Sequence, residues 1–247
     1  MEVIKRIIIL LLPILLVSCS EQTDVSLEEF EIEADVFVSG KALMTLDYGL
    51  HLLEEQSENH EILLIGVHGS ESRGYEWVYP LQTLDTPETL TLFFRWNDKK
   101  CPGPSYEKLY SSIDSLLQLN TNLKEVVVIG HSYGALLVSM FLSEWSKDTP
   151  LAVHAIAGPL AGMPSINSLC LYNPPNLINN NVKFYEWRTI QALDGAFRDL
   201  NYDPQIVEIK KSAVTRLPET YKGNKLGHNW SISWVADEIK KTNQYQD

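Results

Sequence analysis

The residues that most suggest chemistry surround Ser132, in the run GHSYG at residues 130–134. Residues 126–129 are β-branched and lack a polar face, as in a buried strand, and residues 135–145 favour an apolar helix. A serine at the tip of so short a turn has strained backbone angles, and flanking glycines let neighbouring chain approach closely. The G-x-S-x-G pattern in this setting predicts a nucleophilic serine. The alternative is an ordinary glycine-rich turn.

A serine hydroxyl is a poor nucleophile at neutral pH and needs a base within hydrogen-bond reach. Among the six histidines, His228 follows the last expected strand, in a loop that can fold over the sheet. It is therefore the predicted base, and an exposed loop histidine without a role is the alternative. The other five are expected elsewhere. His51 and His60 precede the sheet core, and His154 lies within a strand. His68 belongs to the loop after the strand at residues 62–67, and His131 lies in the turn but points away from Ser132.

The base needs an acidic partner to fix its tautomer, and three aspartates follow the expected strand at residues 182–187. Asp194 precedes Gly195 and two apolar residues, as expected of a carboxylate at a tight turn with buried neighbours. Asp199 and Asp203 look more like surface or turn residues. Asp194 is therefore the predicted acid.

Acyl transfer also needs donors aimed at the developing oxyanion, and backbone N–H groups serve best because they are fixed before the reaction. The expected strand at residues 62–67 ends in His68-Gly69-Ser70. The N–H groups of Ser70 and Tyr133 are the natural pair. A loop glycine after a strand, without function, is the alternative.

Alternating strands and helices position these residues, which predicts a mostly parallel sheet with helices on both faces. Ligands bind such sheets at the carboxyl ends of the strands. Near the amino terminus, residues 30–38 alternate like a half-exposed strand, and residues 42–55 favour a helix. The later strands are expected at residues 62–67, 90–96, 126–129, 152–157, 182–187 and 205–210, and the helices at 75–84, 106–117 with Ser105 as cap, 135–145 and 231–241.

This order of strands and motifs resembles the α/β-hydrolase superfamily over roughly residues 60–240, in its serine esterase and lipase-like members. The resemblance implies Ser132 as nucleophile, His228 as general base and then acid, Asp194 orienting His228, and Ser70 with Tyr133 as the oxyanion hole. The N-terminal part departs from the family, since one strand is expected before residue 60 where the family usually has an antiparallel pair.

Many members of this superfamily have a helical cap, but residues 159–181 leave room for one core helix and little more. The minimal cap implies an open cleft, suited to small or water-accessible acyl esters, with Trp77, Tyr133, Trp187 and Trp230 as apolar walls. Three functions remain open: a carboxylic ester hydrolase, an acyltransferase or thioesterase with the same triad, and a non-catalytic lipid-anchored binding protein. Loss of a triad member usually marks the last, and none is missing.

The chain begins like a secretory signal, because Lys5 and Arg6 precede an apolar run at residues 7–17 that is too short to span a bilayer. The run ends in Leu-Val-Ser before Cys19, which resembles a bacterial lipobox. That resemblance implies cleavage before Cys19 and lipidation of its thiol, and the following Ser20 points to the outer membrane. A conventional secreted protein is the alternative. The expected organisation is a signal peptide at 1–18, a tether at 19–28 and one domain at 29–247.

The chain is acidic, with a formal net charge of −12, and removing residues 1–18 (one Glu, one Lys, one Arg) changes it to −13. An acidic surface argues against nucleic acid and leaves the acyl anchor as the means of membrane attachment. No cofactor or metal motif is present. Cys101 and Cys170 are able to pair in an oxidising compartment, but the sequence leaves this open, together with the oligomeric state.

Overall fold

The computed structural model describes residues 25–242, apart from the side chains of residues 32–35. Its centre is a seven-stranded sheet with the order β1-β3-β2-β4-β5-β6-β7. Only the β1–β3 pair is antiparallel, and the other neighbours are parallel. The strands are β1 (Gly49–Leu52), β2 (Ile62–Val67), β3 (Thr89–Arg95), β4 (Glu125–His131), β5 (Leu151–Ile156), β6 (Val182–Arg188) and β7 (Ala213–Arg216), beside a small ribbon of β8 (Thr220–Tyr221) and β9 (Asn224–Lys225).

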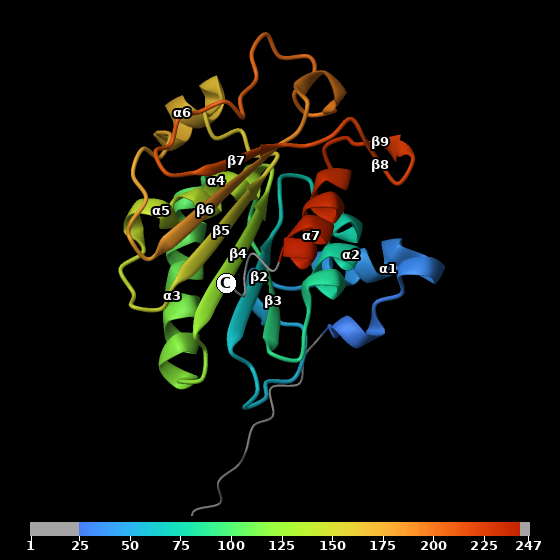
Figure 1. The fold of residues 1–247 in the computed structure, drawn as a ribbon, viewed down its shortest axis with the longest axis vertical. Coiled ribbons are helices and arrows are strands. Elements are labelled where there is room, and N and C mark those ends of the chain that lie inside the picture. The colour runs from blue at the N-terminus through green and yellow to red at the C-terminus, as the bar shows by residue number, and fades with distance from the viewer. Residues whose placement is uncertain (1–24, 243–247) are drawn as a thin grey trace, which may run out of the picture.

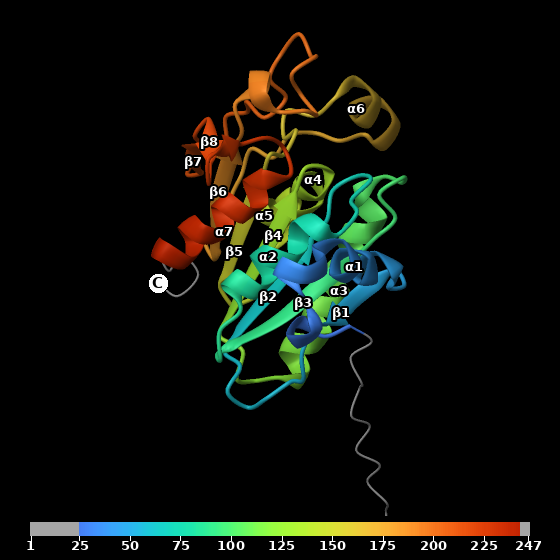
Figure 2. The ribbon, with the colours of Figure 1, turned by 90° about the vertical axis from the view of Figure 1, so that its right-hand side faces the viewer.

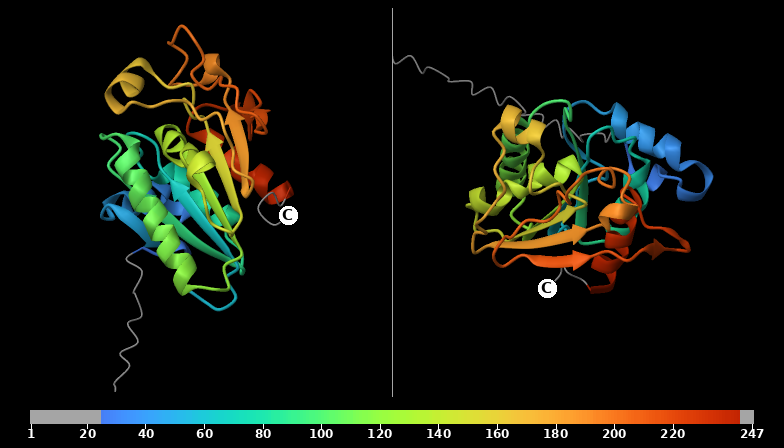
Figure 3. Two further views of the ribbon diagram at one scale, coloured as in Figure 1. Left: turned by 90° about the vertical axis from the view of Figure 1, so that its left-hand side faces the viewer. Right: turned by 90° about the horizontal axis from the view of Figure 1, so that it is seen from above.

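Helices cover both faces of this sheet (Figures 1 and 2). One face holds α1 (Ile32–Thr45), α2 (Tyr75–Leu84) and α7 (Trp230–Thr242). The other holds α3 (Pro102–Leu119), α4 (Tyr133–Ser139) and α5 (Phe141–Glu144), as Figure 3 shows. The short helix α6 (Pro164–Cys170) lies beyond the carboxyl ends of the strands. Two 3-10 turns, Leu27–Glu29 and Gln191–Leu193, complete the regular elements of the described residues.

The central strands are buried on both faces, which explains their continuous apolar runs. Every residue of β2 and β5 is buried, and so is all of β4 after its first residue. Parallel strands between two helical layers have this pattern because neither face meets water. Trp77 and Trp187, expected as cleft walls, are instead buried in the core on the α2 and α7 side.

The N-terminal expectations are wrong in detail. Residues 30–38 belong largely to α1 and not to a strand, and the helix expected at 42–55 ends at Thr45, before β1. The buried face of α1 includes Ser39 and Gly40. Neither is strongly apolar, so the hydropathy of the sequence does not show the helical period of this segment. A Cβ at Gly40 would lie 2.1 Å from the backbone nitrogen of Tyr75, so glycine is needed where α1 meets α2.

Three later expectations also need correction. Helix α3 begins at Pro102 after Cys101, so Ser105 lies inside it and is not its cap. The helix expected at 135–145 is divided at Met140 into α4 and α5. Residues 205–210 do not form a strand. The last strand of the sheet is β7, at Ala213–Arg216. Gln205 is instead buried in a loop, where its side chain accepts from the Thr189 N–H just after β6.

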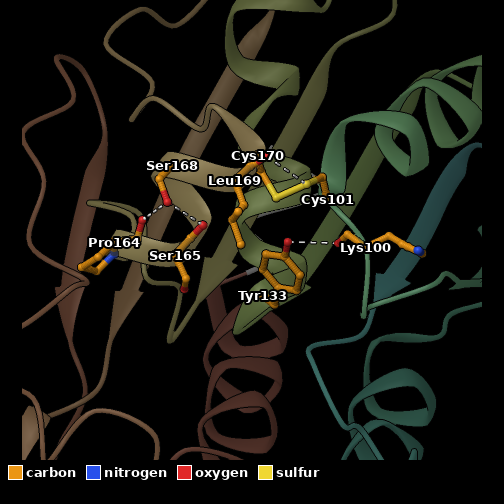
Figure 4. Close-up of a disulfide and its surroundings, with 8 residues drawn as sticks. All are labelled: Lys100, Cys101, Tyr133, Pro164, Ser165, Ser168, Leu169 and Cys170. Carbon is orange, nitrogen blue, oxygen red and sulfur yellow. Dashed lines mark hydrogen bonds between the residues drawn. A yellow bond between two sulfur atoms is a disulfide. The ribbon is translucent and has the colours of Figure 1, made fainter.

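The helix expected in residues 159–181 is present as α6, but it is not a core helix, since none of its residues is buried. Cys170 at its end forms a disulfide with Cys101, the residue that precedes α3, with the two Cα atoms 5.3 Å apart (Figure 4). This pairing settles what the sequence left open.

The expected signal peptide, Cys19 and most of the tether lie outside the described residues. Within the expected tether, Leu27 is buried and its N–H donates to the Leu53 carbonyl at 2.8 Å, so packing begins before residue 29. In residues 25–242, no helix has the length and hydropathy to cross a bilayer.

Candidate active site

Ser132 lies at the junction of β4 and α4 with backbone angles φ 55° and ψ −120°, outside the usual regions for a residue with a side chain. Its N–H donates to the Ile156 carbonyl at the end of β5, at 2.9 Å. The hydroxyl has no hydrogen-bond partner within the described part of the chain. A strained, partly exposed serine at the carboxyl edge of the sheet is the arrangement expected of a nucleophile.

Close packing around this turn requires its glycines. A Cβ at Gly134 would lie 2.4 Å from the Val67 carbonyl oxygen, and one at Gly130 would lie 2.5 Å from Cγ2 of Val138. A Cβ at Gly69, in the loop after β2, would lie 2.8 Å from Cβ of Ser132. The loop after β2 therefore lies directly against Ser132.

The structure brings Asp194 and His228 together. Nδ1 of His228 is 2.9 Å from each carboxylate oxygen of Asp194. The Thr189 hydroxyl and the Ala196 N–H, the latter at 2.8 Å, also donate to the carboxylate, which has no exposed surface. Burial by itself raises the pKa of Asp194, but these three partners outweigh it and leave the pKa below its ordinary value of 3.8. Asp194 is therefore an ionised, buried acceptor for a proton on Nδ1.

Two rings hold the His228 imidazole between them. The His131 ring centre lies 4.6 Å away and the Phe197 ring stands perpendicular at 5.2 Å. Nε2 of His131 donates to the His228 carbonyl at 3.1 Å, and the Ser231 hydroxyl donates to the same oxygen at 2.5 Å. Burial, with a further effect of the His228 charge, holds the pKa of His131 well below its ordinary value, so this ring is neutral. Sequence reasoning gave His131 no function, because its contact with His228 spans 97 residues.

The other two candidate acids lie elsewhere. The Asp199 side chain is 88% exposed and pairs with Arg198. Asp203 accepts from the Gln205 side chain at 3.0 Å and from Arg216 at 3.2 Å. Gln205 in turn accepts from the Thr189 N–H at 2.8 Å. Asp203 thus acts at a distance, by ordering the loop that holds Thr189 beside Asp194.

Sequence reasoning did not find Thr189 and Gln205. The available signal was the position of Thr189, a polar residue directly after the buried strand β6. Polar residues at the carboxyl ends of such strands lie at the ligand-binding edge.

The N–H groups of Ser70 and Tyr133 have no hydrogen-bond acceptor among residues 25–242. Glu71, with φ 56°, fixes the loop next to Ser70, because its N–H donates to Asp98 at 2.7 Å. His68 shapes the same loop: Nδ1 donates to the Gly69 carbonyl at 2.8 Å and Nε2 accepts from the Trp96 N–H at 3.2 Å. Burial lowers the pKa of His68 to about 4, so this arrangement is that of a neutral ring.

One expected contact is not made. Within the described residues no hydrogen bond joins Ser132 to His228, whose ring uses only Nδ1. Trp230, expected as a cleft wall, lines a pocket between α1, α2 and α7. Tyr133, the residue after Ser132, lines another pocket, between the loop before α3 and α6. No cluster of His, Cys, Asp and Glu in residues 25–242 has an arrangement that would hold a metal ion.

No protein-family model matches the sequence, and comparison with curated proteins gives no match. Solved structures do resemble it. Est1E of Butyrivibrio proteoclasticus with bound ferulic acid has a TM-score of 0.53 at 14% identity, covering 78% of this chain and 92% of that one. An esterase of Pyrococcus furiosus has a TM-score of 0.51 at 17% identity, covering 78% and 84%.

A third similar structure, from Agrobacterium tumefaciens, is provisionally described as an α/β-hydrolase. Its TM-score is 0.52 at 12% identity, covering 80% of this chain and 90% of that one. Together with the strand order, these similarities show that the chain has the α/β-hydrolase fold.

Proposed function

We propose that this protein is a serine hydrolase that cleaves a carboxylic ester through an acyl-enzyme. The observation that carries the proposal is the buried Asp194 carboxylate on Nδ1 of His228, whose ring contacts His131, the residue before the strained Ser132. A carboxylate so placed keeps the proton on Nδ1 and leaves Nε2 free to act as a base. The contact between nucleophile and base often closes only when substrate binds.

In the first step, the Ser132 oxygen attacks the acyl carbonyl carbon while its proton moves to Nε2 of His228. The carbonyl oxygen becomes an oxyanion, which the N–H groups of Ser70 and Tyr133 stabilise. The tetrahedral intermediate then expels the alcohol, which takes the proton from Nε2. Asp194 stays ionised and stabilises the imidazolium in between.

In the second step, water attacks the acyl-enzyme. His228 removes a proton from this water and returns it to the Ser132 oxygen, which releases the carboxylic acid. Similarity to an esterase, and to a protein with a bound carboxylic acid, supports an ester as the substrate.

Labelling with a fluorophosphonate probe tests the proposal, because the probe reacts with an activated serine. We expect labelling of the wild type, loss of labelling in Ser132→Ala, and full labelling in Ser111→Ala, which removes an exposed serine of α3. The same three proteins are assayed with p-nitrophenyl acetate and with an acetyl thioester. Faster cleavage of the thioester would replace the ester in the proposal, and a wild type that is neither labelled nor active would favour a binding protein.

We further propose that Cys19 carries a lipid that attaches the protein to the bacterial cell envelope. The apolar leader and the residues before Cys19 support this, and so does the Cys101–Cys170 disulfide, which requires an oxidising compartment. We expect the mature protein to begin at a diacylated Cys19 and to fractionate with membranes, and Cys19→Ala to abolish both. Intact mass spectrometry showing an unmodified N-terminus at another residue would contradict this.

A further inference from the structure

A pocket of about 270 Å³ lies between the loop before α3 and the short helix α6, and Tyr133 of the Ser132 turn is part of its lining. Tyr133 follows Ser132 directly, and Figure 4 shows its ring between Lys100 and the residues of α6. One side is the loop Asp98–Cys101, and the other is α6, through Ile166, Leu169 and Cys170.

Helix α6 presents one face to this pocket, since residues three and four apart lie on the same side of a helix. Ile166, Leu169 and Cys170 have this spacing, and Figure 4 shows Leu169 extending from α6 on the side of Tyr133. The Tyr133 hydroxyl donates to the Lys100 carbonyl at 3.1 Å, which fixes the ring against the opposite loop. The pocket therefore has two walls, of which α6 supplies the apolar one.

Little buried side-chain packing of its own holds α6, although the buried Leu160 and Tyr172 anchor the chain on either side. The helix has seven residues, none of them buried, and an isolated helix of that length is unstable in water. Its last residue, Cys170, is bonded to Cys101 of the opposite wall. The disulfide thus joins the two sides of the pocket and sets the position of the wall that Ile166 and Leu169 form.

The position of the pocket identifies the part of the substrate that would enter it. His228 must lie near the leaving oxygen. It directly precedes Asn229, whose side chain donates to the Tyr75 hydroxyl of α2, and α7 begins at Trp230. The carbonyl oxygen points to the N–H groups of Ser70 and Tyr133. The remaining substituent of the reacting carbon is the acyl chain. The pocket is lined by the loop before α3, by Tyr133 of α4 and by α6, and its lining includes neither His228 nor any residue of α2 or α7.

We propose that this pocket binds the acyl chain of the ester, that Leu169 and Ile166 limit the chain length, and that the Cys101–Cys170 disulfide positions them. The inference rests on the proposed function, because it assigns a subsite of that reaction. A pocket of this size and apolar wall suits a short, unbranched or slightly branched acyl chain more than a long fatty acyl chain.

Hydrolysis of p-nitrophenyl acetate and p-nitrophenyl hexanoate by matched variants tests the proposal. Leu169→Trp fills the pocket, and we expect it to lower kcat/KM for the hexanoate relative to the acetate by about tenfold or more. Leu171→Trp is the control, because Leu171 is as exposed as Leu169 (80% and 79%) but does not line this pocket. We expect the control to keep the wild-type ratio.

Breaking the disulfide is the second arm. In the Cys101→Ser, Cys170→Ser variant we expect kcat/KM for the hexanoate, divided by kcat/KM for the acetate, to rise above the wild-type value. The reason is that α6 no longer limits the length of the pocket. Equal ratios in the wild type, Leu169→Trp and the double-serine variant would overturn the acyl pocket while leaving the hydrolase proposal standing. A wild type that cleaves neither ester and is not labelled at Ser132 would instead remove the proposed function, and this subsite with it.

Discussion

Asp194 has no exposed surface, and His228, Thr189 and Ala196 all donate to its carboxylate. These contacts keep the carboxylate ionised and so keep the imidazole proton of His228 on Nδ1. The neutral His131 ring and the Phe197 ring leave the His228 imidazole little freedom to rotate. The orientation of one imidazole is thus fixed by residues from β4 and from the loop after β6.

The Asp194→Asn variant tests this orientation. The amide donates a hydrogen bond where the carboxylate accepts one, so it favours the wrong imidazole tautomer, and we expect kcat to fall by up to about 10⁴. Measurement of kcat and melting temperature separates chemistry from folding. Asp199→Asn is the control, since that side chain is 88% exposed, and it should change neither quantity. A kcat of Asp194→Asn close to the wild-type value would contradict the assignment if kcat of Asp199→Asn or Asp203→Asn fell strongly at an unchanged melting temperature.

The lowered pKa of Asp194 also predicts how stability depends on pH. The folded-state pKa lies below 3.8, so on acidification the unfolded chain takes up this proton first. The stabilisation from the ionised carboxylate is therefore fully present above about pH 4 and is lost as the pH falls through the folded-state pKa.

Denaturant unfolding of the wild type and Asp194→Asn between pH 7 and pH 3 measures this effect. We expect the difference in their free energies of unfolding to be constant near neutrality and to shrink below about pH 4. A difference that grows on acidification would mean that Asp194 is protonated more readily in the folded protein than in the unfolded chain.

At the scale of elements, the turn between β4 and α4 depends on close contact with the end of β2. Gly134 is the tightest point, because an added Cβ would lie 2.4 Å from the Val67 carbonyl oxygen. To make room for a side chain at Gly134, either the end of β2 or the start of α4 would have to move. The close approach of Gly69 to Ser132 also holds the loop that carries Ser70 against this turn.

We therefore expect Gly134→Ala to lower the free energy of unfolding by at least about 1–3 kcal/mol, the cost of overpacking, and to reduce kcat in any folded fraction. Gly103→Ala, in the first turn of α3, is the control, since an added Cβ there meets nothing within 4 Å. Chemical denaturation measures both variants. Equal stability of the two would show that the turn tolerates a side chain.

At the scale of the whole molecule, the disulfide joins the start of α3 to the segment after β5 and closes a loop with a sequence separation of 69 residues. Such a cross-link restricts the unfolded chain and stabilises the fold by roughly 4 kcal/mol on the chain-entropy estimate. We expect a reducing agent to lower the denaturation midpoint of the wild type accordingly. The Cys101→Ser, Cys170→Ser variant should show the lower midpoint with or without reductant, and an unchanged wild-type midpoint would contradict the prediction.

The sequence alone determined the inner strands β2 to β6, the turn at Ser132 and the fold class, but neither edge strand of the sheet. These features have local causes: strands buried on both faces must be apolar throughout, and a strained turn needs glycines around its serine. The candidate base could be predicted in the same way, because His228 follows the last strand of an alternating chain. The order of these signals along the chain is sufficient because parallel strands end at the same edge of the sheet.

Only the tertiary structure decided the features that depend on contacts distant in sequence. Asp194 and His228 are 34 residues apart, and the carboxylate reaches Nδ1 because Thr189 and Ala196 hold it there. Helix α1 could not be predicted from apolar periodicity, because Ser39 and Gly40, which are not strongly apolar, occupy its buried face against α2. The Cys101–Cys170 pairing and the surface position of α6 also depend on where β5 and α3 bring the chain, which no local pattern encodes.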